Sequence, residues 1–408
     1  MMTSIDYISS KTRNDYQKDN FDDFLASIKF SFNIPAIHVA GTNGKGSTCT
    51  LLKDIYIANG YKVGLFTSPD KATEMIKIND VSIPVLFIDS VIKEYKKQIE
   101  KYDLSTFEIL TFVALKWFMS EKVDIAIIEC GMGGAFDATN IFTPILSIIT
   151  TISIEHSDYL GQSLSEIALH KAGIIKENIP VLIGNLEGDA LTTVVQKCKE
   201  TDSTLTILDH THNVTRINNG LSFDYRPYLG LYISNLAEYR VSDACLAVEA
   251  TNLLGEQFPV KEDLLKEGLR VSKLKCRFEV IEGNPTIILD GAHNPEGIES
   301  LRKAIDKTFY GRTIHVVFAA FRDKNIAQML PEISLIGKIT LTTFHHVRAR
   351  TEEDYFLYLE DYAFEESFES LIDRLIEENK DDVILVTGSL AFTYVVREYL
   401  IMKGIIRD

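Results

Sequence analysis

The sequence has few of the features that mark several classes of protein. Its five cysteines, at positions 49, 130, 198, 245 and 276, are scattered and form no C-x-x-C pair. This pattern argues against a zinc site or a disulfide framework and indicates reduced thiols. No apolar run is long enough to span a bilayer, and the N-terminal segment has no signal-peptide core. We therefore predict a cytoplasmic protein with no membrane partner.

Basic residues are also in deficit. The chain has 42 Lys and Arg against 58 Asp and Glu, a formal net charge of −16. Binding to a nucleic acid backbone relies on clustered Lys and Arg, so nucleic acid is not expected as a partner. Two acidic stretches, residues 352–354 and 360–369, are interpreted as solvated surfaces.

The alternation of β-rich and helical runs predicts the fold class of the first two-thirds of the chain. At 408 residues the chain is too long for one ordinary core, so two domains are expected. Apolar strands that alternate with helices indicate a parallel sheet covered on both faces. The strands expected here are 36–40, 62–67, 123–130, 145–152, 180–183 and 204–208, and the helices are 47–58, 87–102, 106–119, 164–174, 190–200 and 241–254.

A second alternating series begins near residue 275. Before it, the stretch 213–232 is expected to be antiparallel, with Asn218-Asn-Gly220 as a hairpin turn. We predict a P-loop-type, mostly parallel α/β domain over residues 1–273, followed by a smaller Rossmann-like α/β domain over 274–408, with the active site between them. The strands expected in the second series are 286–290, 313–320, 338–344 and 382–387, with a last helix at 390–402.

The run Ile37–Thr48 is the most informative feature of the sequence. An apolar strand leads into a loop with three glycines around Lys45, and the loop leads into a helix. The glycines let backbone N–H groups face a phosphate, the helix N-terminus adds positive potential, and the lysine reaches the outer phosphates. The match to G-x-x-x-x-G-K-[ST] is imperfect, because Val39 replaces the first glycine and Gly46 follows the lysine. A simple Gly-rich turn is the alternative; the flanking strand and helix favour nucleotide binding.

Three residues beyond this loop are candidates for metal or phosphate chemistry. Glu129 ends an apolar strand just before a glycine cluster, where a P-loop protein completes its Mg²⁺ site. A solvated strand-end acid is the alternative, which the glycines disfavour. His156 follows the next strand, where its spacing fits a structural histidine and a metal ligand equally well. Lys171, taken alone, is typical of a surface lysine on a helix.

The second domain offers a strand end with two candidate residues. Asp290 and His293 follow an apolar strand at the edge where open sheets bind ligands. Asn294 before Pro295 is explained as a helix N-cap. Farther on, Gly388-Ser389 precedes the last helix, and this segment either holds an anion on backbone amides or forms a short turn.

Taken together, these runs resemble the folylpolyglutamate synthase/dihydrofolate synthase family, within the Mur-type ATP-dependent amide ligases. The shared motifs are HVAGTNGKGS, FTSP, TFE, ECGMGG-DATN, the ITTIS-EH run with LG and KAGIIK after it, RFEVI, DGAHNP, DK and GSL, in family order over roughly residues 35–400. The resemblance implies that ATP phosphorylates a folate or pteroate carboxylate and that the amine of L-glutamate attacks the acyl phosphate. It also implies Mg²⁺, with a monovalent cation as a further candidate, and a monomer is expected.

The resemblance assigns roles position by position. Lys171 matches a lysine that is carbamylated to make an extra carboxylate near the metal. The implied catalytic residues are Lys45, Lys171 and His293; the ATP contacts are Asn43, Gly44, Lys45, Gly46, Ser47, Thr48, Arg277 and Asp290; the Mg²⁺ ligands are Ser68, Glu129 and His156; and the substrate contacts are Thr106, Phe107, Glu108, Phe136 and Ser389.

Several positions depart from the family pattern, and most of them lie in or near the segments that face the folate. Two other hypotheses therefore stand beside the leading one: the same ligation on a different acid, and a catalytically degenerate nucleotide-binding paralogue. The resemblance does not distinguish dihydrofolate synthesis from polyglutamate extension, nor the folate form or tail length. The departures are Asp70, Met75, Ala135, Glu155, His170 and Asp243.

Overall fold

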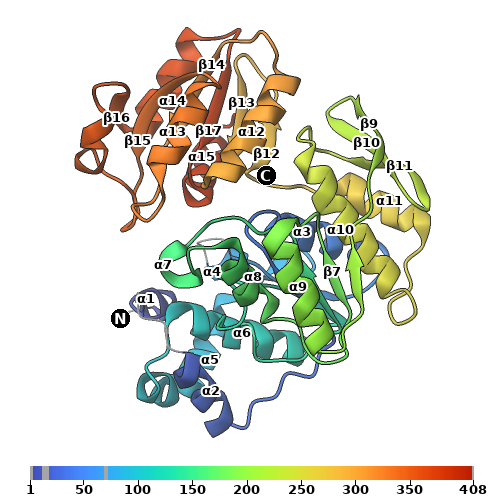
Figure 1. Ribbon diagram of the computed structural model, residues 1–408. Coiled ribbons are helices and arrows are strands. Elements are labelled where there is room, and N and C mark those ends of the chain that lie inside the picture. Colours follow the sequence, from blue (N-terminus) through green and yellow to red (C-terminus); the bar gives the residue numbers. More distant parts are fainter. Residues whose placement is uncertain (1–2, 12–17, 69–71, 407–408) are drawn as a thin grey trace. The chain divides into compact units, whose positions relative to one another are not determined.

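The computed structural model describes residues 3–11, 18–68 and 72–406. The chain forms two compact units, coloured along the sequence in Figure 1. The long segment of the second unit starts at Lys273, and two short earlier segments, Val214–Ser222 and Ile233–Val241, also cluster with it. The functional division into domains at residue 273 stays a prediction.

The first unit contains an eight-stranded sheet in the order β4-β3-β2-β5-β1-β6-β7-β8. Six neighbouring strands, β2, β5, β1, β6, β7 and β8, pair in parallel. Strands β3 and β4 extend the sheet beyond β2 as antiparallel neighbours. The central strands β1, β5 and β6 are buried along their whole length, as expected when helices cover both faces. The strands are β1 Ala36–Ala40, β2 Val63–Phe66, β3 Ile76–Ile78, β4 Val81–Ser82, β5 Ile125–Glu129, β6 Leu146–Ile149, β7 Val181–Ile183 and β8 Leu205–Ile207.

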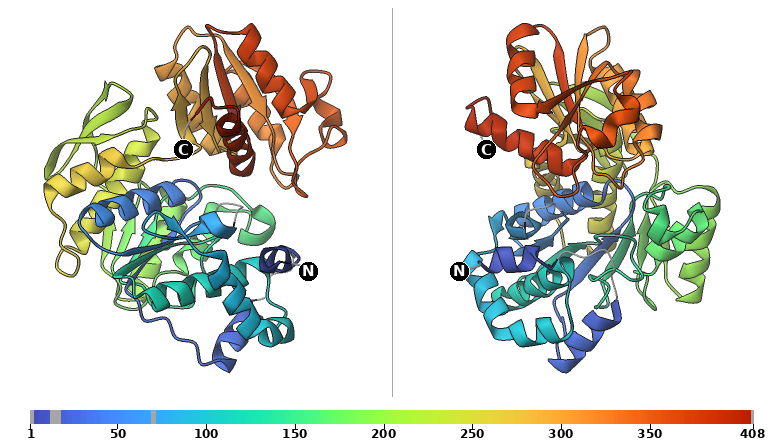
Figure 2. Two further views of the ribbon diagram at one scale, coloured as in Figure 1. Left: turned by 180° about the vertical axis from the view of Figure 1, so that it is seen from behind. Right: turned by 90° about the vertical axis from the view of Figure 1, so that its left-hand side faces the viewer.

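Helices surround this sheet in all three ribbon views (Figures 1 and 2). Helix α3 (Lys45–Ala58) packs on β1, β2 and β5, and α11 (Glu262–Val271) packs on α3. Gly268 allows that close approach, because a Cβ there would lie 2.6 Å from the Cα of Ile55. The other helices of this part are α1 Ser4–Ser9, α2 Lys18–Ser27, α4 Ala72–Met75, α5 Val85–Lys101, α6 Thr106–Glu121, α7 Ser157–Leu160, α8 Leu164–Ala172, α9 Gly188–Glu200 and α10 Tyr239–Leu253. The first three residues of α10 belong to the second unit.

A small sheet in the order β11-β10-β9 follows β8 in the chain. It consists of β9 (His212–Ile217), β10 (Gly220–Tyr225) and β11 (Tyr228–Ile233). Two-residue connections join only antiparallel neighbours. Asn218 has φ 52°, as a tight hairpin turn requires, so the predicted hairpin is confirmed.

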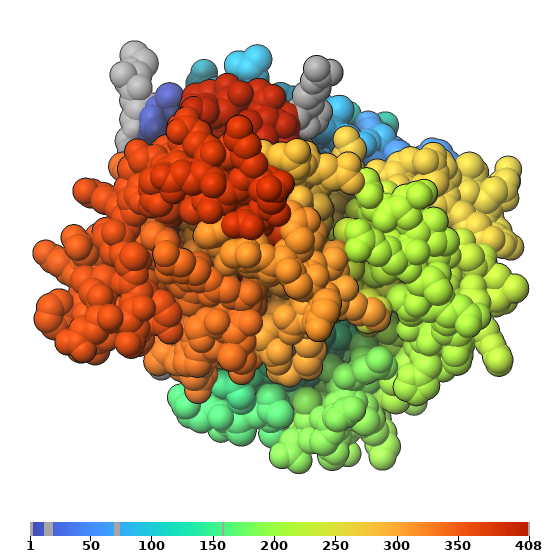
Figure 3. All heavy atoms as spheres, turned by 90° about the horizontal axis from the view of Figure 1, so that it is seen from above, coloured from blue at the N-terminus to red at the C-terminus, as the bar shows by residue number. Residues whose placement is uncertain are grey.

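The second unit contains a six-stranded sheet in the order β12-β13-β17-β14-β15-β16. All neighbours pair in parallel except β12, which is antiparallel to β13. This unit forms the orange-to-red surface in Figure 3, and α15 packs on β13 and β17. Its elements are β12 Arg277–Ile281, β13 Thr286–Asp290, α12 Pro295–Thr308, β14 Ile314–Phe318, α13 Ile326–Ser334, β15 Lys338–Thr343, the 3₁₀ helix η1 Glu353–Tyr358, β16 Ala363–Ser367, α14 Phe368–Glu378, β17 Val383–Thr387 and α15 Leu390–Met402.

The predicted fold class is confirmed, and every predicted strand and helix is present with its ends within three residues of those expected. The strand predicted at 145–152 is shorter in the structure, where Leu146–Ile149 pairs in the sheet. Among the described residues, no helix combines the length and apolar character that crossing a membrane requires.

Candidate active site

The phosphate loop between β1 and α3 depends on two glycines. Gly44 is the N-cap of α3 with φ 85°, and a Cβ there would lie 2.3 Å from Oδ1 of Asp243. A Cβ at Gly41 would lie 1.9 Å from Oγ1 of Thr150. Left-handed backbone and close side-chain neighbours both exclude other residues from position 44. The glycine spacing therefore has a steric cause.

Two threonines after β6 fix the shape of the loop. The backbone N–H of Asn43 donates to Oγ1 of Thr151 at 2.9 Å, and Oγ1 of Thr150 donates to the carbonyl of Asn43 at 2.6 Å. The N–H of Thr42 donates to the carbonyl of Thr151 at 2.8 Å. These hydrogen bonds hold the phosphate loop in one conformation before a ligand binds. The sequence did not single out Thr150 and Thr151, although both lie within the ITTIS run.

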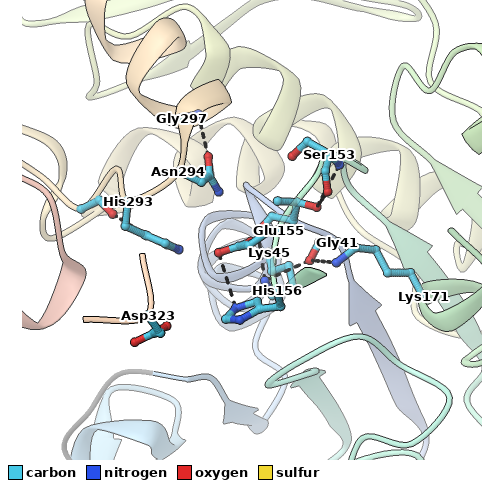
Figure 4. A network of polar contacts seen from close by, with 12 residues as sticks. Gly41, Lys45, Ser153, Glu155, His156, Lys171, His293, Asn294, Gly297 and Asp323 are labelled. Atoms are coloured by element: carbon cyan, nitrogen blue, oxygen red, sulfur yellow. Dashed lines mark hydrogen bonds and ion pairs between the residues drawn. The ribbon is translucent and has the colours of Figure 1, made fainter. Parts of the chain in front are cut away.

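Two lysines meet at the loop, as Figure 4 shows. Nζ of Lys45 donates to the carbonyls of Gly41 and Thr42 at 3.0 and 3.1 Å, and Nζ of Lys171 donates to the carbonyl of Gly41 at 2.8 Å. Lys171 is only 3% exposed, so its interpretation as a surface lysine is wrong. Burial, with the positive charge of Lys45, lowers the pKa of Lys171 to about 7.

The helix that follows the loop begins with hydroxyl side chains. Ser47 and Thr48 are buried in the first turn of α3. Among the described residues, Oγ1 of Thr48 has no hydrogen-bond partner. A buried hydroxyl of this kind fits a site that a polar ligand completes.

Glu129 ends β5 beside the segment that carries Ser68. The carboxylate is 4% exposed, so the alternative of a solvated acid is wrong. Its Oε2 accepts the N–H of Ser68 at 3.1 Å. Carboxylate and hydroxyl oxygens suit Mg²⁺, which keeps several waters and binds ligand phosphates. The described residues hold no group of three or more His, Cys, Asp and Glu placed to bind a metal.

His156 lies at the start of α7 in a left-handed conformation, with φ 51°. Its Nε2 is 3.5 Å from Oε1 of Glu155 (Figure 4). The role of His156 as a metal ligand stays a prediction.

The predicted substrate contacts differ in what they touch. Oγ1 of Thr106 donates to the carbonyl of Ile8 at 2.7 Å, and the ring of Phe107 lies 5.6 Å from that of Phe66. Glu108 is fully buried and closes a capping box with Ser105. These contacts explain the TFE residues as structural. Their role toward a substrate stays a prediction.

Phe136 has a different environment from the TFE residues. Its side chain is 61% exposed, and its ring lies 5.4 Å from the ring of His170. An exposed aromatic ring of this kind is available to a ligand. Phe136 therefore remains the predicted substrate contact with the most accessible side chain.

A buried polar cluster behind the loop was missed from the sequence. Nε2 of His38 lies 2.8 Å from Oγ1 of Thr139 and 3.1 Å from Sγ of Cys130. Thr139 in turn donates to Asp137 at 2.5 Å. Burial lowers the pKa of His38 to about 3, so this histidine is neutral. The cluster ties the DATN segment to β1 and β5.

Two of the residues that depart from the family pattern are tightly packed. Met75 is buried in a hydrophobic core cluster that also contains residues of α5 and α6. Ala135 lies against Gly173, where a Cβ at residue 173 would be 2.3 Å from the Cα of Ala135. Asp70 lies outside the described residues.

In the second unit, Asp290 is surrounded by donors. It ends β13 and is 2% exposed. Its Oδ1 accepts the N–H of Ala292 at 2.9 Å, and its Oδ2 accepts the hydroxyl of Tyr239 at 3.0 Å. Arg240 pairs with the same oxygen at 3.5 Å. Arg277 stands opposite Asp290 in the sheet register. Tyr239 and Arg240 were missed, because nothing in their local sequence points to β13.

The loop after Asp290 is ordered by its own hydrogen bonds. Nδ1 of His293 donates to the carbonyl of Gly291 at 2.8 Å. Asn294 caps α12 by accepting the N–H of Gly297 at 2.8 Å (Figure 4), which confirms its predicted role. Ser389 occupies the N-cap position of α15, is 2% exposed and makes no capping hydrogen bond.

Two family models match the chain. The Mur ligase middle domain matches residues 39–225, and the Mur ligase glutamate ligase domain matches residues 276–390. The two matches follow one another along the chain in the same order as the two sheets.

Individual proteins give a longer match. The folylpolyglutamate synthase of Lacticaseibacillus casei is 31% identical over 384 residues, 90% of each chain. The dihydrofolate synthase/folylpolyglutamate synthase of Bacillus subtilis is 32% identical over 390 residues, again 90% of each chain. The solved FPGS-AMPPCP-folate complex superposes with a TM-score of 0.85 at 28% identity, over 97% of this chain and 98% of that one.

These matches cover both sheets and the loops that carry the site residues. The resemblance inferred from the motifs is confirmed. The chain belongs to the folylpolyglutamate synthase/dihydrofolate synthase family of Mur-type ligases.

Proposed function

We propose that this chain uses ATP to join L-glutamate to a folate-type carboxylate through an acyl phosphate. Membership of the family makes it an ATP-dependent, amide-forming ligase. The observation that carries the proposal is the phosphate loop, in which Lys45 and Lys171 both donate to the carbonyl of Gly41. A similar protein has been solved with AMPPCP and folate bound, which supports the same substrate classes here.

The first-unit residues would bind and neutralise the phosphates. The backbone from Asn43 to Gly46 offers N–H groups, and Lys45 offers a positive charge for the transferred phosphoryl group. Ser68, Glu129 and His156 would hold Mg²⁺. When bound, Mg²⁺ supplies charge neutralisation of the phosphate oxygens. These assignments are supported by the burial of Glu129 and by its hydrogen bond from the backbone of Ser68.

Lys171 is suited to carbamylation. Its pKa of about 7 leaves a large neutral fraction near neutral pH. The lone pair of the neutral Nζ attacks CO₂, an N–C bond forms and one proton is released, which leaves a carbamate with one negative charge. That charge would remove the repulsion between Lys171 and Lys45.

The second unit would contribute Arg277 and Asp290 to ATP and His293 to the acyl phosphate. The carboxylate of Asp290 is held by Ala292 and Tyr239, so its orientation is set before a ligand arrives. Nδ1 of His293 donates to the carbonyl of Gly291, which fixes the orientation of the ring.

We further propose a cytoplasmic monomer that acts on small molecules. All five cysteines are buried and free, which supports a reducing compartment. The net charge of −16 supports the absence of nucleic acid as a partner.

The proposal is tested by glutamate-dependent phosphate release with ATP, Mg²⁺ and either dihydropteroate or tetrahydrofolate. We expect release and a product one glutamate heavier with one acid or both, which also distinguishes dihydrofolate synthesis from polyglutamate extension. A folded protein that releases phosphate with neither acid would falsify the folate claim. Activity on another carboxylic acid would then favour ligation of a different substrate.

A further inference from the structure

Asp243 places a buried acid beside the phosphate loop. It lies in α10 and is 6% exposed. Its Oδ1 occupies the space that a Cβ at Gly44 would need, at 2.3 Å. Gly44 is the N-cap of α3, and the first N–H groups of a helix point toward a phosphate bound there. A negative charge therefore stands next to the position expected for the nucleotide phosphates.

This charge has opposite effects with and without a nucleotide. In the free protein it is favourable, because the N-terminus of α3 attracts negative charge. Nζ of Lys45, which carries the positive charge proposed for the phosphates, lies at the same loop, where it donates to the carbonyl of Gly41. Once polyphosphate is bound, two like charges lie close together in a partly desolvated site, where repulsion is strong. A divalent cation on the phosphates removes much of that repulsion.

We propose that Asp243 is a specificity residue that makes nucleotide binding conditional on a bound divalent cation. Nucleotide with Mg²⁺ is accepted, and metal-free nucleotide is disfavoured. The role rests on the proposed function, since it takes the phosphate loop as the ATP site. Asp243 would distinguish nucleotide with Mg²⁺ from metal-free nucleotide. The glycines of the loop and Lys45 do not make this distinction, because they favour any phosphate anion.

The test is a calorimetric titration with ADP and with AMPPCP, each in excess Mg²⁺ and in excess EDTA. The variant Asp243→Asn keeps the size of the side chain and removes its charge. We expect the variant to bind metal-free ADP about tenfold more tightly, or about 1.4 kcal/mol, while its affinity with Mg²⁺ changes less than about threefold. The quantity compared is the ratio of the dissociation constant in EDTA to the dissociation constant in Mg²⁺. Both constants are measured on one preparation, so their ratio does not depend on the fraction of protein that is folded.

The matched control is Glu249→Gln on the same helix. Glu249 accepts from the hydroxyl of Tyr225 at 3.1 Å, and we expect its variant to leave the ratio unchanged. Asp243→Ser, a second variant that removes the charge, is expected to lower the ratio in the same direction.

Two results would overturn the role of Asp243. One is an unchanged ratio in both Asp243 variants, and the other is weaker binding in Mg²⁺ alone, which would make Asp243 a metal ligand. If the folded wild type binds neither nucleotide under either condition, the proposed function fails and the role fails with it. Normal binding with an unchanged ratio overturns only the role.

Discussion

The candidate sites of the two units differ in whether backbone or side-chain groups form them. In the first unit the site is mainly backbone: Gly41 and Gly44 leave room for neighbouring side chains, and Lys45 and Lys171 bind a backbone carbonyl. In the second unit the site is mainly side chain, with Asp290 held by a hydroxyl and a guanidinium. A backbone site requires particular residues at fixed spacing, whereas a side-chain site requires partners that are distant in sequence. The two sites should therefore fail differently when mutated.

The largest effect is expected from Lys45→Ala. We expect kcat/KM to fall at least about a hundredfold, because a charge contact to the transferred phosphoryl group is lost. Initial rates of phosphate release measure this loss. Lys199→Ala, at the exposed end of α9, is the matched control and should retain full activity. Equal rates for both variants would remove the phosphate-loop mechanism.

The next largest effect separates two glycines with nearly the same backbone. Gly44 and Gly60 have φ of 85° and 88°. An alanine Cβ at Gly44 would meet the side chain of Asp243, whereas one at Gly60 would have no neighbour within 4 Å. We expect Gly60→Ala to cost about 1 kcal/mol of unfolding free energy, from left-handed strain alone. Gly44→Ala should cost about 3 kcal/mol, because contact with Asp243 is added.

Urea denaturation of both variants measures this difference. Adding Asp243→Ala to Gly44→Ala should recover the part that the contact causes. Equal losses for the two glycine variants would show that conformation alone, and not the neighbouring carboxylate, requires Gly44.

A smaller effect is expected from pH. The pKa of Lys171 is lowered from 10.5 to about 7 in the folded protein, so between these pH values the unfolded chain binds more protons than the folded one. The free energy of unfolding should then rise with pH across this window, by at most about 1.4 kcal/mol for each pH unit from this one group.

The measurement is urea denaturation of the wild type and Lys171→Met at several pH values above 7. The methionine variant should lose that part of the slope. A wild-type slope that matches the variant's would mean that Lys171 keeps an ordinary pKa in the folded protein.

The smallest effect tests the second unit. Asn294 caps α12 through Gly297, whereas Ser389 makes no capping bond at α15. Asn294→Ala should cost about 1 kcal/mol and Ser389→Ala less than about 0.5 kcal/mol. Chemical denaturation measures both. If Ser389 contacts substrate as predicted, its variant should nevertheless raise KM, and an unchanged KM would contradict that role.

The elements that were predicted accurately are those whose local pattern agrees with their tertiary position. Strand β1 and helix α15 match their expected bounds at both ends, since each is a clear apolar segment between breaking residues. Strand β12 was missed as a separate element. It is an antiparallel edge strand, and the polar, half-buried residues Arg277 and Glu279 weaken its apolar pattern.

Among the site residues, the sequence pointed to positions but not to environments. The burial of Glu129 agrees with the apolar strand and glycines around it, whereas the burial of Lys171 does not follow from its neighbours in the chain. Thr150, Tyr239 and Arg240 were not recognised at all, because each acts through a partner far away in sequence.

The sequence by itself determined the two α/β units, the nucleotide loop and the family, because periodicity, glycine spacing and motif order are local and linear. Only the tertiary structure decided that Lys171 shares the carbonyl of Gly41 with Lys45, and that Asp243 stands against Gly44. Burial and charge proximity arise when distant segments pack together. These two quantities set the pKa of Lys171 and the electrostatic environment of the loop, and no local pattern encodes them.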